Sequence, residues 1–220
     1  MTAYAFTFAG QSLAALPSGA LHWPARRLLV VSDLHLGKSE RLARRGGSLL
    51  PPYETRETLT RLSDDLEITG AKSLISLGDS FDDLTAAGTL DDTDRMTLNR
   101  LMAGRDWTWV EGNHDSGTFA LGGTHRAEAT LGTITFRHIA TAQTPEVSGH
   151  YHPKARLGST TRRCFLIDAQ RIILPAYGAY TGGLYCDDAV LTALMADTAI
   201  AVLTGTKAIP CPMPRSRLKL

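Results

Sequence analysis

Strands and helices alternate through the first half of the chain, and this alternation restricts the possible folds more than any other feature. Apolar runs at 28–32, 73–77 and 107–110 have the length expected of buried strands. The segment 53–69 carries leucines at helical spacing, and 91–103 begins with acidic residues that favour a helix N-terminus. This order predicts a βαβ sheet, in which a ligand site lies at the carboxyl ends of the strands.

The second half of the chain is expected to add antiparallel strands. Loose alternation over 4–16 predicts a hairpin that leads into the first sheet. A helix near 187–196 and a strand near 199–204 are expected towards the end of the chain. We predict one domain over 1–220, with a loosely packed tail at 210–220 that contains three prolines. Short β-type runs separated by turns occur at 133–137, 146–149, 163–167 and 171–174.

Composition excludes several classes of protein. The formal net charge is +1, so contact with nucleic acid would need a local basic patch rather than bulk charge. The three cysteines are widely spaced, which fits buried thiols in a reducing compartment. The N-terminus lacks a signal-peptide pattern, and no run approaches the roughly 18 apolar residues of a membrane span. We therefore expect a cytoplasmic protein with no membrane contact.

Residues that can bind a metal ion follow each predicted strand of the first half. Asp33 and His35 follow the first strand, Asp79 follows the second, and the third ends in Gly112-Asn113-His114-Asp115. Alternate residues of an extended chain point the same way, so we expect Asp33 and His35 to converge on one point. Three further histidines lie at or near the ends of later β-type runs, namely His138, His150 and His152.

This set of side chains predicts a site for two divalent metal ions. Mn²⁺, Fe²⁺ and Zn²⁺ all accept mixed carboxylate and imidazole ligands. A carboxylate oxygen that bridges two ions holds them about 3.5–4 Å apart, where they share a water whose pKa falls towards neutrality. Asp79 is the bridging candidate, because it directly follows a glycine at the end of a central strand. Asn113 offers a neutral oxygen, which limits the negative charge that a phosphate would meet.

The order Asp-x-His, Gly-Asp-x-x-Asp, Gly-Asn-His-Asp, a single His and Gly-His-x-His resembles the calcineurin-like metallophosphoesterase superfamily. The resemblance implies a four-layer α/β/β/α sandwich of two facing mixed β-sheets. It also implies that His114 acts at the leaving group and that Asp115 orients His114. His138 departs from the pattern, since many members have Gly or a second His beside this residue. The implied ligands are Asp33, His35, Asp79 and His152 for one ion, and Asp79, Asn113, His138 and His150 for the other.

A narrower resemblance covers most of the chain. The segments 33–38 and 174–184 are similar to those of the ligase-associated bacterial metallophosphoesterases. That group is associated with DNA damage response as an endonuclease or phosphodiesterase. Its implied partners are a DNA ligase, an exonuclease and a helicase.

Several residues near these motifs allow two interpretations. The basic residues Lys38, Arg41, Arg44 and Arg45 form either a solvated face or a patch that contacts phosphates at the mouth of the site. Asp82 and Asp83 either orient a metal ligand or lie in solvent. Tyr177 and Tyr180 are more often packing residues than platforms for base stacking.

The sequence therefore predicts an enzyme that hydrolyses phosphodiester bonds, with DNA as the leading substrate and manganese as the leading metal. Iron and zinc remain possible, because the ligand types do not separate these metals. A nucleotide-sugar pyrophosphatase and a small-molecule phosphodiesterase or phosphatase would share the metal site. A binding scaffold that has lost its metals is the alternative of another class, although every ligand type is intact here.

Overall fold

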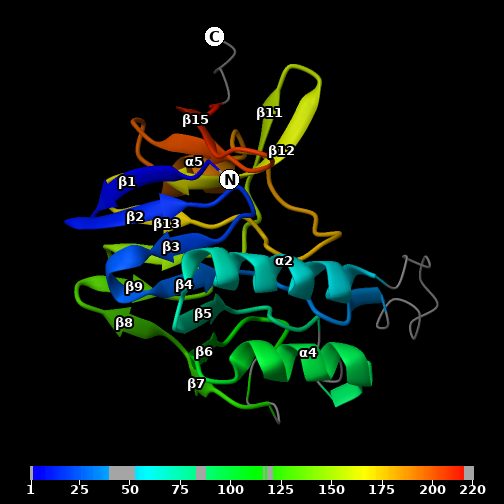
Figure 1. Ribbon diagram of the computed structural model, residues 1–220. Helices are drawn as coiled ribbons and strands as arrows, with labels where there is room; N and C mark the ends of the chain where they lie inside the picture. The colour runs from blue at the N-terminus through cyan, green and yellow to red at the C-terminus, as the bar shows by residue number, and fades with distance from the viewer. Residues whose placement is uncertain (1, 40–52, 83–87, 116, 118–120, 216–220) are drawn as a thin grey trace.

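Two β-sheets pack face to face in the computed structural model, with helices on the outer faces (Figure 1). The structure describes residues 2–39, 53–82, 88–115, 117 and 121–215.

The first sheet has seven strands, and its spatial order is the same as its order along the chain. The first four strands are antiparallel, and the fourth to seventh strands run parallel to one another. The predicted βαβ arrangement is confirmed, because α2 (Glu54–Thr69) and α4 (Asp92–Met102) connect successive parallel strands. The strands are β1 (Tyr4–Phe8), β2 (Gln11–Ala15), β3 (Leu21–Trp23), β4 (Leu28–Val31), β5 (Ser73–Leu77), β6 (Asp106–Val110) and β7 (Thr124–Arg126). A short 3-10 helix, η1 (Pro24–Arg26), precedes β4.

The second sheet has eight strands, in the order β15-β14-β12-β13-β10-β9-β8, with β11 paired to β12. One short helix, α5 (Ala189–Leu194), belongs to this half of the chain. The strands are β8 (Ala129–Leu131), β9 (Ile134–Phe136), β10 (Glu146–Ser148), β11 (Lys154–Leu157), β12 (Thr160–Ile167), β13 (Arg171–Ile173), β14 (Ile200–Leu203) and β15 (Ile209–Pro212).

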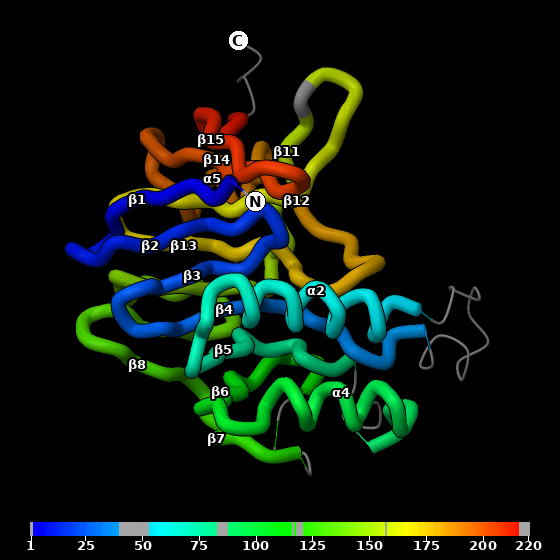
Figure 2. The backbone as a smooth tube through the Cα atoms, in the orientation of Figure 1, coloured from blue at the N-terminus to red at the C-terminus, as the bar shows by residue number. Residues whose placement is uncertain are grey.

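Three apolar cores separate four layers, which confirms the predicted sandwich. Alternate residues of a strand face opposite sides of its sheet. In β4, Val31 therefore packs in the core under α2 and α4, whereas Val30 packs between the two sheets. In β12, Phe165 faces the core between the sheets, and Leu166 packs in a third core with Leu191 of α5. Helices α2 and α4 cover the outer face of the first sheet over its parallel strands, as Figure 2 also shows.

The expected antiparallel pairing is found between β8 and β9 and between β12 and β13, but the structure differs from expectation at β10 and in the tail. β10 is parallel to both of its neighbours, β9 and β13, because the chain crosses over rather than turning back between these strands. The tail is packed as far as residue 215: β15 pairs with β14, Met213 is buried, and the Arg215 guanidinium donates to the carbonyl of Thr192. Residues 216–220 lie outside the described part of the chain.

The parallel strands place their carboxyl ends at one edge of the sandwich. In Figure 1 this edge is on the right, at the end where α2 begins. Among the described residues, no helix combines the length and the apolar character that a membrane span requires.

Candidate metal centre

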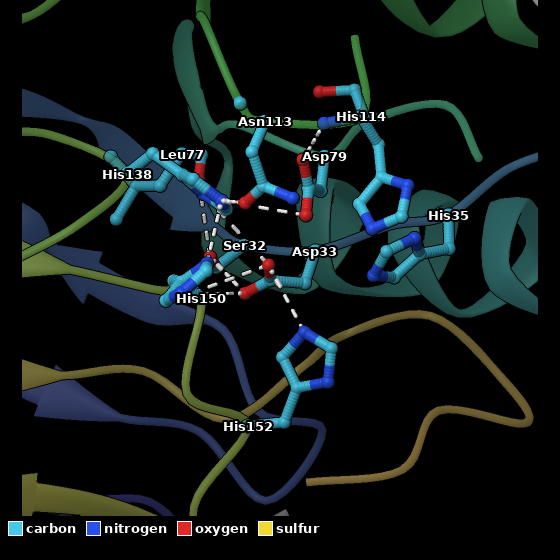
Figure 3. Close-up of polar contacts among 12 residues, drawn as sticks. Ser32, Asp33, His35, Leu77, Asp79, Asn113, His114, His138, His150 and His152 are labelled. Atoms are coloured by element: carbon cyan, nitrogen blue, oxygen red, sulfur yellow. Dashed lines mark hydrogen bonds and ion pairs between the residues drawn. The ribbon is translucent and has the colours of Figure 1, made fainter. Parts of the chain in front are cut away.

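The residues that the sequence predicts as metal ligands come together at this edge of the sandwich. They are supplied by both sheets, from the segments that follow β4, β5, β6, β9 and β10. Figure 3 shows their side chains pointing towards a common centre. The residues are Asp33, His35, Asp79, Asn113, His138, His150 and His152.

The first set of side chains comprises Asp33, His35 and His152. One ligand atom of each lies within 4.8 Å of the ligand atoms of the others. The carboxylate of Asp33 is fully buried, and its Oδ1 lies 3.1 Å from Nε2 of His152. Nε2 of His35 is buried and has no hydrogen-bond partner among the described residues. Because an unpartnered buried nitrogen is costly, this atom fits a role as a metal ligand.

The second set comprises Asp79, His138 and His150, again with one atom of each within 4.8 Å of the others. Nε2 of His138 lies 3.4 Å from Oδ2 of Asp79 and 3.2 Å from Nδ1 of His150. Oδ1 of Asn113 is 2.9 Å from the same nitrogen. Four atoms that can each donate a lone pair therefore surround one point, which suits a divalent cation.

Hydrogen bonds made by Nδ1 fix the orientation of two of these histidine rings. Nδ1 of His138 donates to the carbonyl of Leu77 at 2.8 Å, which leaves Nε2 directed at the second set. Nδ1 of His35 lies 3.1 Å from Oδ1 of Asp82, which leaves Nε2 directed at the first set. A ring nitrogen that donates in this way selects the tautomer whose other nitrogen can bind a metal.

The sequence left the role of Asp82 open, and the structure places it against a candidate ligand. The side chain of Asp82 is buried and contacts the ring of His35. Asp83 lies outside the described residues. The signal for Asp82 was the Gly-Asp-x-x-Asp spacing, in which the second Asp lies three residues after Asp79.

Replacing Asp82 with Ala is expected to weaken metal binding at the first set by about 10- to 100-fold, since the acceptor that orients His35 is lost. Asp82→Asn keeps an oxygen acceptor, so its metal affinity is expected to fall less than that of Asp82→Ala. Isothermal titration with Mn²⁺ measures both variants. Equal affinities in Asp82→Ala and the wild type would show that His35 needs no such support.

The backbone of the candidate ligands was not predicted correctly. We expected Asp33 and His35 to lie on an extended strand, but β4 ends at Val31. Five candidate ligands have positive φ, a conformation that non-glycine residues seldom adopt. Residues in such conformations cluster at functional sites, where the surrounding structure holds them in place. Their φ values are 54° for Asp33, 46° for His35, 46° for Asp79, 71° for His150 and 47° for His152.

Asp115 is buried and accepts four hydrogen bonds from backbone N–H groups. Its Oδ1 accepts from Asp79 at 3.0 Å and from Gly112 at 3.1 Å. Its Oδ2 accepts from Ser80 at 2.7 Å and from Phe81 at 3.2 Å. These bonds tie the segment after β5 to the segment after β6, so Asp115 fixes the position of Asp79. The sequence missed this contact, and the predicted orientation of His114 by Asp115 stays a prediction.

The charges at the site balance one another. Burial opposes ionisation of Asp33, but the hydrogen bond to His152 and the positive charges of His152 and His138 outweigh it and lower the pKa of Asp33. Burial lowers the pKa of His138, yet the hydrogen bond to Asp79 and the charges of Asp33 and Asp79 raise it overall to about 9. The two carboxylates therefore favour positive charge between them, which a proton or a metal ion can supply.

The other predicted site residues lie around this centre. His114 is exposed, and its ring centroid is 5.5 Å from that of His35. Its backbone N–H donates to Oδ1 of Asp79 at 2.9 Å. Lys38 is half-buried in the segment that follows His35. Arg41, Arg44 and Arg45 lie outside the described residues, so a basic patch there stays a prediction.

The fold is an α/β/β/α sandwich, and each of the two sets of side chains could hold a divalent metal ion. No protein-family model and no curated protein sequence matches the chain. Among solved structures, the chain is similar to the nuclease MPE of Pseudomonas putida, with a TM-score of 0.76 and 28% sequence identity. The match covers 96% of this chain and 100% of that protein. The similarity therefore extends over nearly the whole chain.

Proposed function

We propose that this protein is a phosphodiesterase that uses two divalent metal ions to hydrolyse phosphodiester bonds in DNA. The observation that carries the proposal is the pair of adjacent Asp and His sets at one edge of the sandwich. The similarity to a solved nuclease over nearly the whole chain supports a nucleic-acid substrate. A role in DNA repair beside a ligase, an exonuclease and a helicase is part of the proposal and rests on the sequence resemblance.

The residues of the chain fit two metal ions. Asp33, His35 and His152 would hold one ion, and His138, His150 and Asn113 would hold the other, with Asp79 shared between them. Bound ions of this kind supply Lewis-acid stabilisation of phosphate oxygens and lower the pKa of bound water. Manganese is the first choice, with iron and zinc as alternatives that the same ligands accept.

Protein side chains supply the remaining chemistry. His114 lies at the exposed side of the centre and donates a proton to the departing oxygen. Asn113 keeps the second set from becoming too negative for an anionic substrate, because its amide oxygen is neutral. Asp115 holds the Asp79 segment rigid through its four backbone hydrogen bonds, which preserves the spacing of the two sets.

A substrate panel under one metal condition tests the proposal. The panel contains bis-p-nitrophenyl phosphate, DNA oligonucleotides, cyclic nucleotides and UDP-sugars, each with Mn²⁺. We expect turnover of the diester and of the oligonucleotides, and loss of both with a chelator. Turnover restricted to UDP-sugars or cyclic nucleotides would favour a pyrophosphatase or a small-molecule phosphodiesterase. No turnover of any substrate would favour a binding scaffold.

A further inference from the structure

The segment from Tyr177 to Leu184 runs along the rim of the candidate metal centre and is anchored at both ends. Backbone N–H groups of Tyr177 and Gly178 donate to the carbonyls of Ser32 and Asp33 at 2.8 and 3.0 Å. At the other end, the N–H of Leu184 donates to the carbonyl of Tyr151 at 3.1 Å. Both anchors are thus made to segments that carry candidate metal ligands.

Two glycines allow this segment to approach the metal ligands closely. A Cβ at Gly178 would lie 2.1 Å from the carbonyl oxygen of Leu34. A Cβ at Gly183, which has φ of +140°, would lie 2.0 Å from the carbonyl oxygen of His152. Only a residue without a side chain fits at either position. The segment is therefore built against the first set of candidate ligands.

Tyr180 lies between these two anchors and differs from the neighbouring Tyr177. Tyr177 is fully buried and donates its hydroxyl to Asp65 at 2.9 Å, so it is a packing residue as predicted. Tyr180 is 45% exposed and has a φ of 53°, a strained conformation for an aromatic residue. Strained residues cluster at functional sites, and Tyr180 lies in a segment whose two ends are bonded to segments that carry candidate metal ligands.

A group of basic residues follows His152 in the sequence. The hairpin of β11 and β12 contains four basic residues and no acidic residue over 154–167. Lys154 Nζ lies 5.0 Å and Arg156 Cζ lies 4.7 Å from the centre of the Tyr185 ring. Asp187 faces Arg156 and offsets part of its charge. In Figures 1 and 2 the hairpin projects above the edge that carries the centre, on the same side as the segment after β13.

We propose that the segment 177–185 and strand β11 form a track for one strand of nucleic acid. Tyr180 stacks on a base next to the scissile phosphodiester, and Lys154 and Arg156 contact phosphates further along the same strand. Exposed aromatic rings beside basic side chains are the usual means of holding an unpaired strand without reading its sequence. The inference rests on the proposed function and adds to it the residues that hold the substrate.

A pair of substrates that differ only in the bases tests the role of Tyr180. One is an oligothymidylate, and the other is a chain of the same length whose sugars carry no bases. We expect the wild type to prefer the strand with bases by about tenfold or more in kcat/KM, and Tyr180→Ala to lose most of that preference. Tyr180→Phe keeps the ring and should keep the preference. Ile68→Ala, an exposed apolar change at the far end of α2, is the matched control.

The outcomes separate this inference from the proposed function. If Tyr180→Ala keeps the wild-type preference, or loses activity equally on both strands, the stacking role is rejected while DNA hydrolysis stands. If the wild type hydrolyses bis-p-nitrophenyl phosphate but cleaves neither strand, the proposed DNA function is rejected, and the track with it.

Salt dependence tests the basic part of the track. Removing one phosphate contact lowers the magnitude of the slope of log kcat/KM against log salt concentration by about 0.7 for a single-stranded oligonucleotide substrate. We expect this change in Arg156→Ala and no change in Arg26→Ala, whose exposed side chain lies at the opposite ends of the strands. An unchanged slope in Arg156→Ala would remove β11 from the track.

Discussion

Replacing Asp79 with Asn is expected to reduce the rate of phosphodiester hydrolysis by at least about 10³-fold. It is also expected to weaken the binding of both metal ions. Asp79 belongs to the second set, and its Oδ2 lies 3.4 Å from His138. Burial opposes its ionisation, but the hydrogen bond to His138 and the charges of His138 and His35 lower the pKa of Asp79. Histidines of both sets therefore stabilise the negative charge of this one carboxylate. A neutral amide at the same position cannot replace that charge.

The fold should survive this substitution. Oδ1 of Asp79 accepts the N–H of His114 at 2.9 Å, and the amide oxygen of Asn can accept the same bond. Elemental analysis gives the metal content, and thermal unfolding in a chelator gives the stability of the metal-free protein. Asp106→Asn, at the exposed start of β6, is the matched control. Loss of only one metal in Asp79→Asn would rule out a carboxylate shared between the two ions.

The sequence predicts the fold well because its patterns are local. The apolar runs and the leucine spacing locate β4, β5, β6 and α2 to within one or two residues. The parallel pairing of β10 was missed, since pairing depends on where the chain crosses between strands rather than on the residues within them. The strand at 209–212 was missed because prolines usually interrupt strand pairing. Its prolines are tolerated because β15 is the edge strand of its sheet.

The site could be predicted as a set of residues but not as a geometry. Ligand-type residues follow strands, and the strand ends of a sandwich meet at one edge, so their proximity was predictable from their order. The left-handed backbone of Asp33 and His35 was not predictable. It depends on backbone hydrogen bonds to the segment after β5, which lies more than forty residues away in the sequence. Three of the four backbone bonds of Asp115 likewise join it to a segment that is distant in sequence.

Replacing His114 with Ala is expected to leave both metal ions bound and to slow cleavage of oligonucleotides by about 10²–10⁴-fold, the usual loss for a general acid. His114 belongs to neither set of candidate ligands, and its exposed ring lies beside that of His35. The departing sugar oxygen of DNA is a poor leaving group and needs a proton. The p-nitrophenolate ion leaves readily without one, so hydrolysis of bis-p-nitrophenyl phosphate should be slowed much less.

This difference between two leaving groups separates proton donation from a structural role. A distorted metal centre would slow both substrates to a similar extent, whereas a missing proton donor slows only the substrate that needs the proton. His22→Ala, which changes a histidine of β3 outside the site, controls for loss of an imidazole elsewhere. Loss of both ions in His114→Ala, or equal slowing of the two substrates, would refute the role of His114 as proton donor and place it instead among the groups that hold the metals.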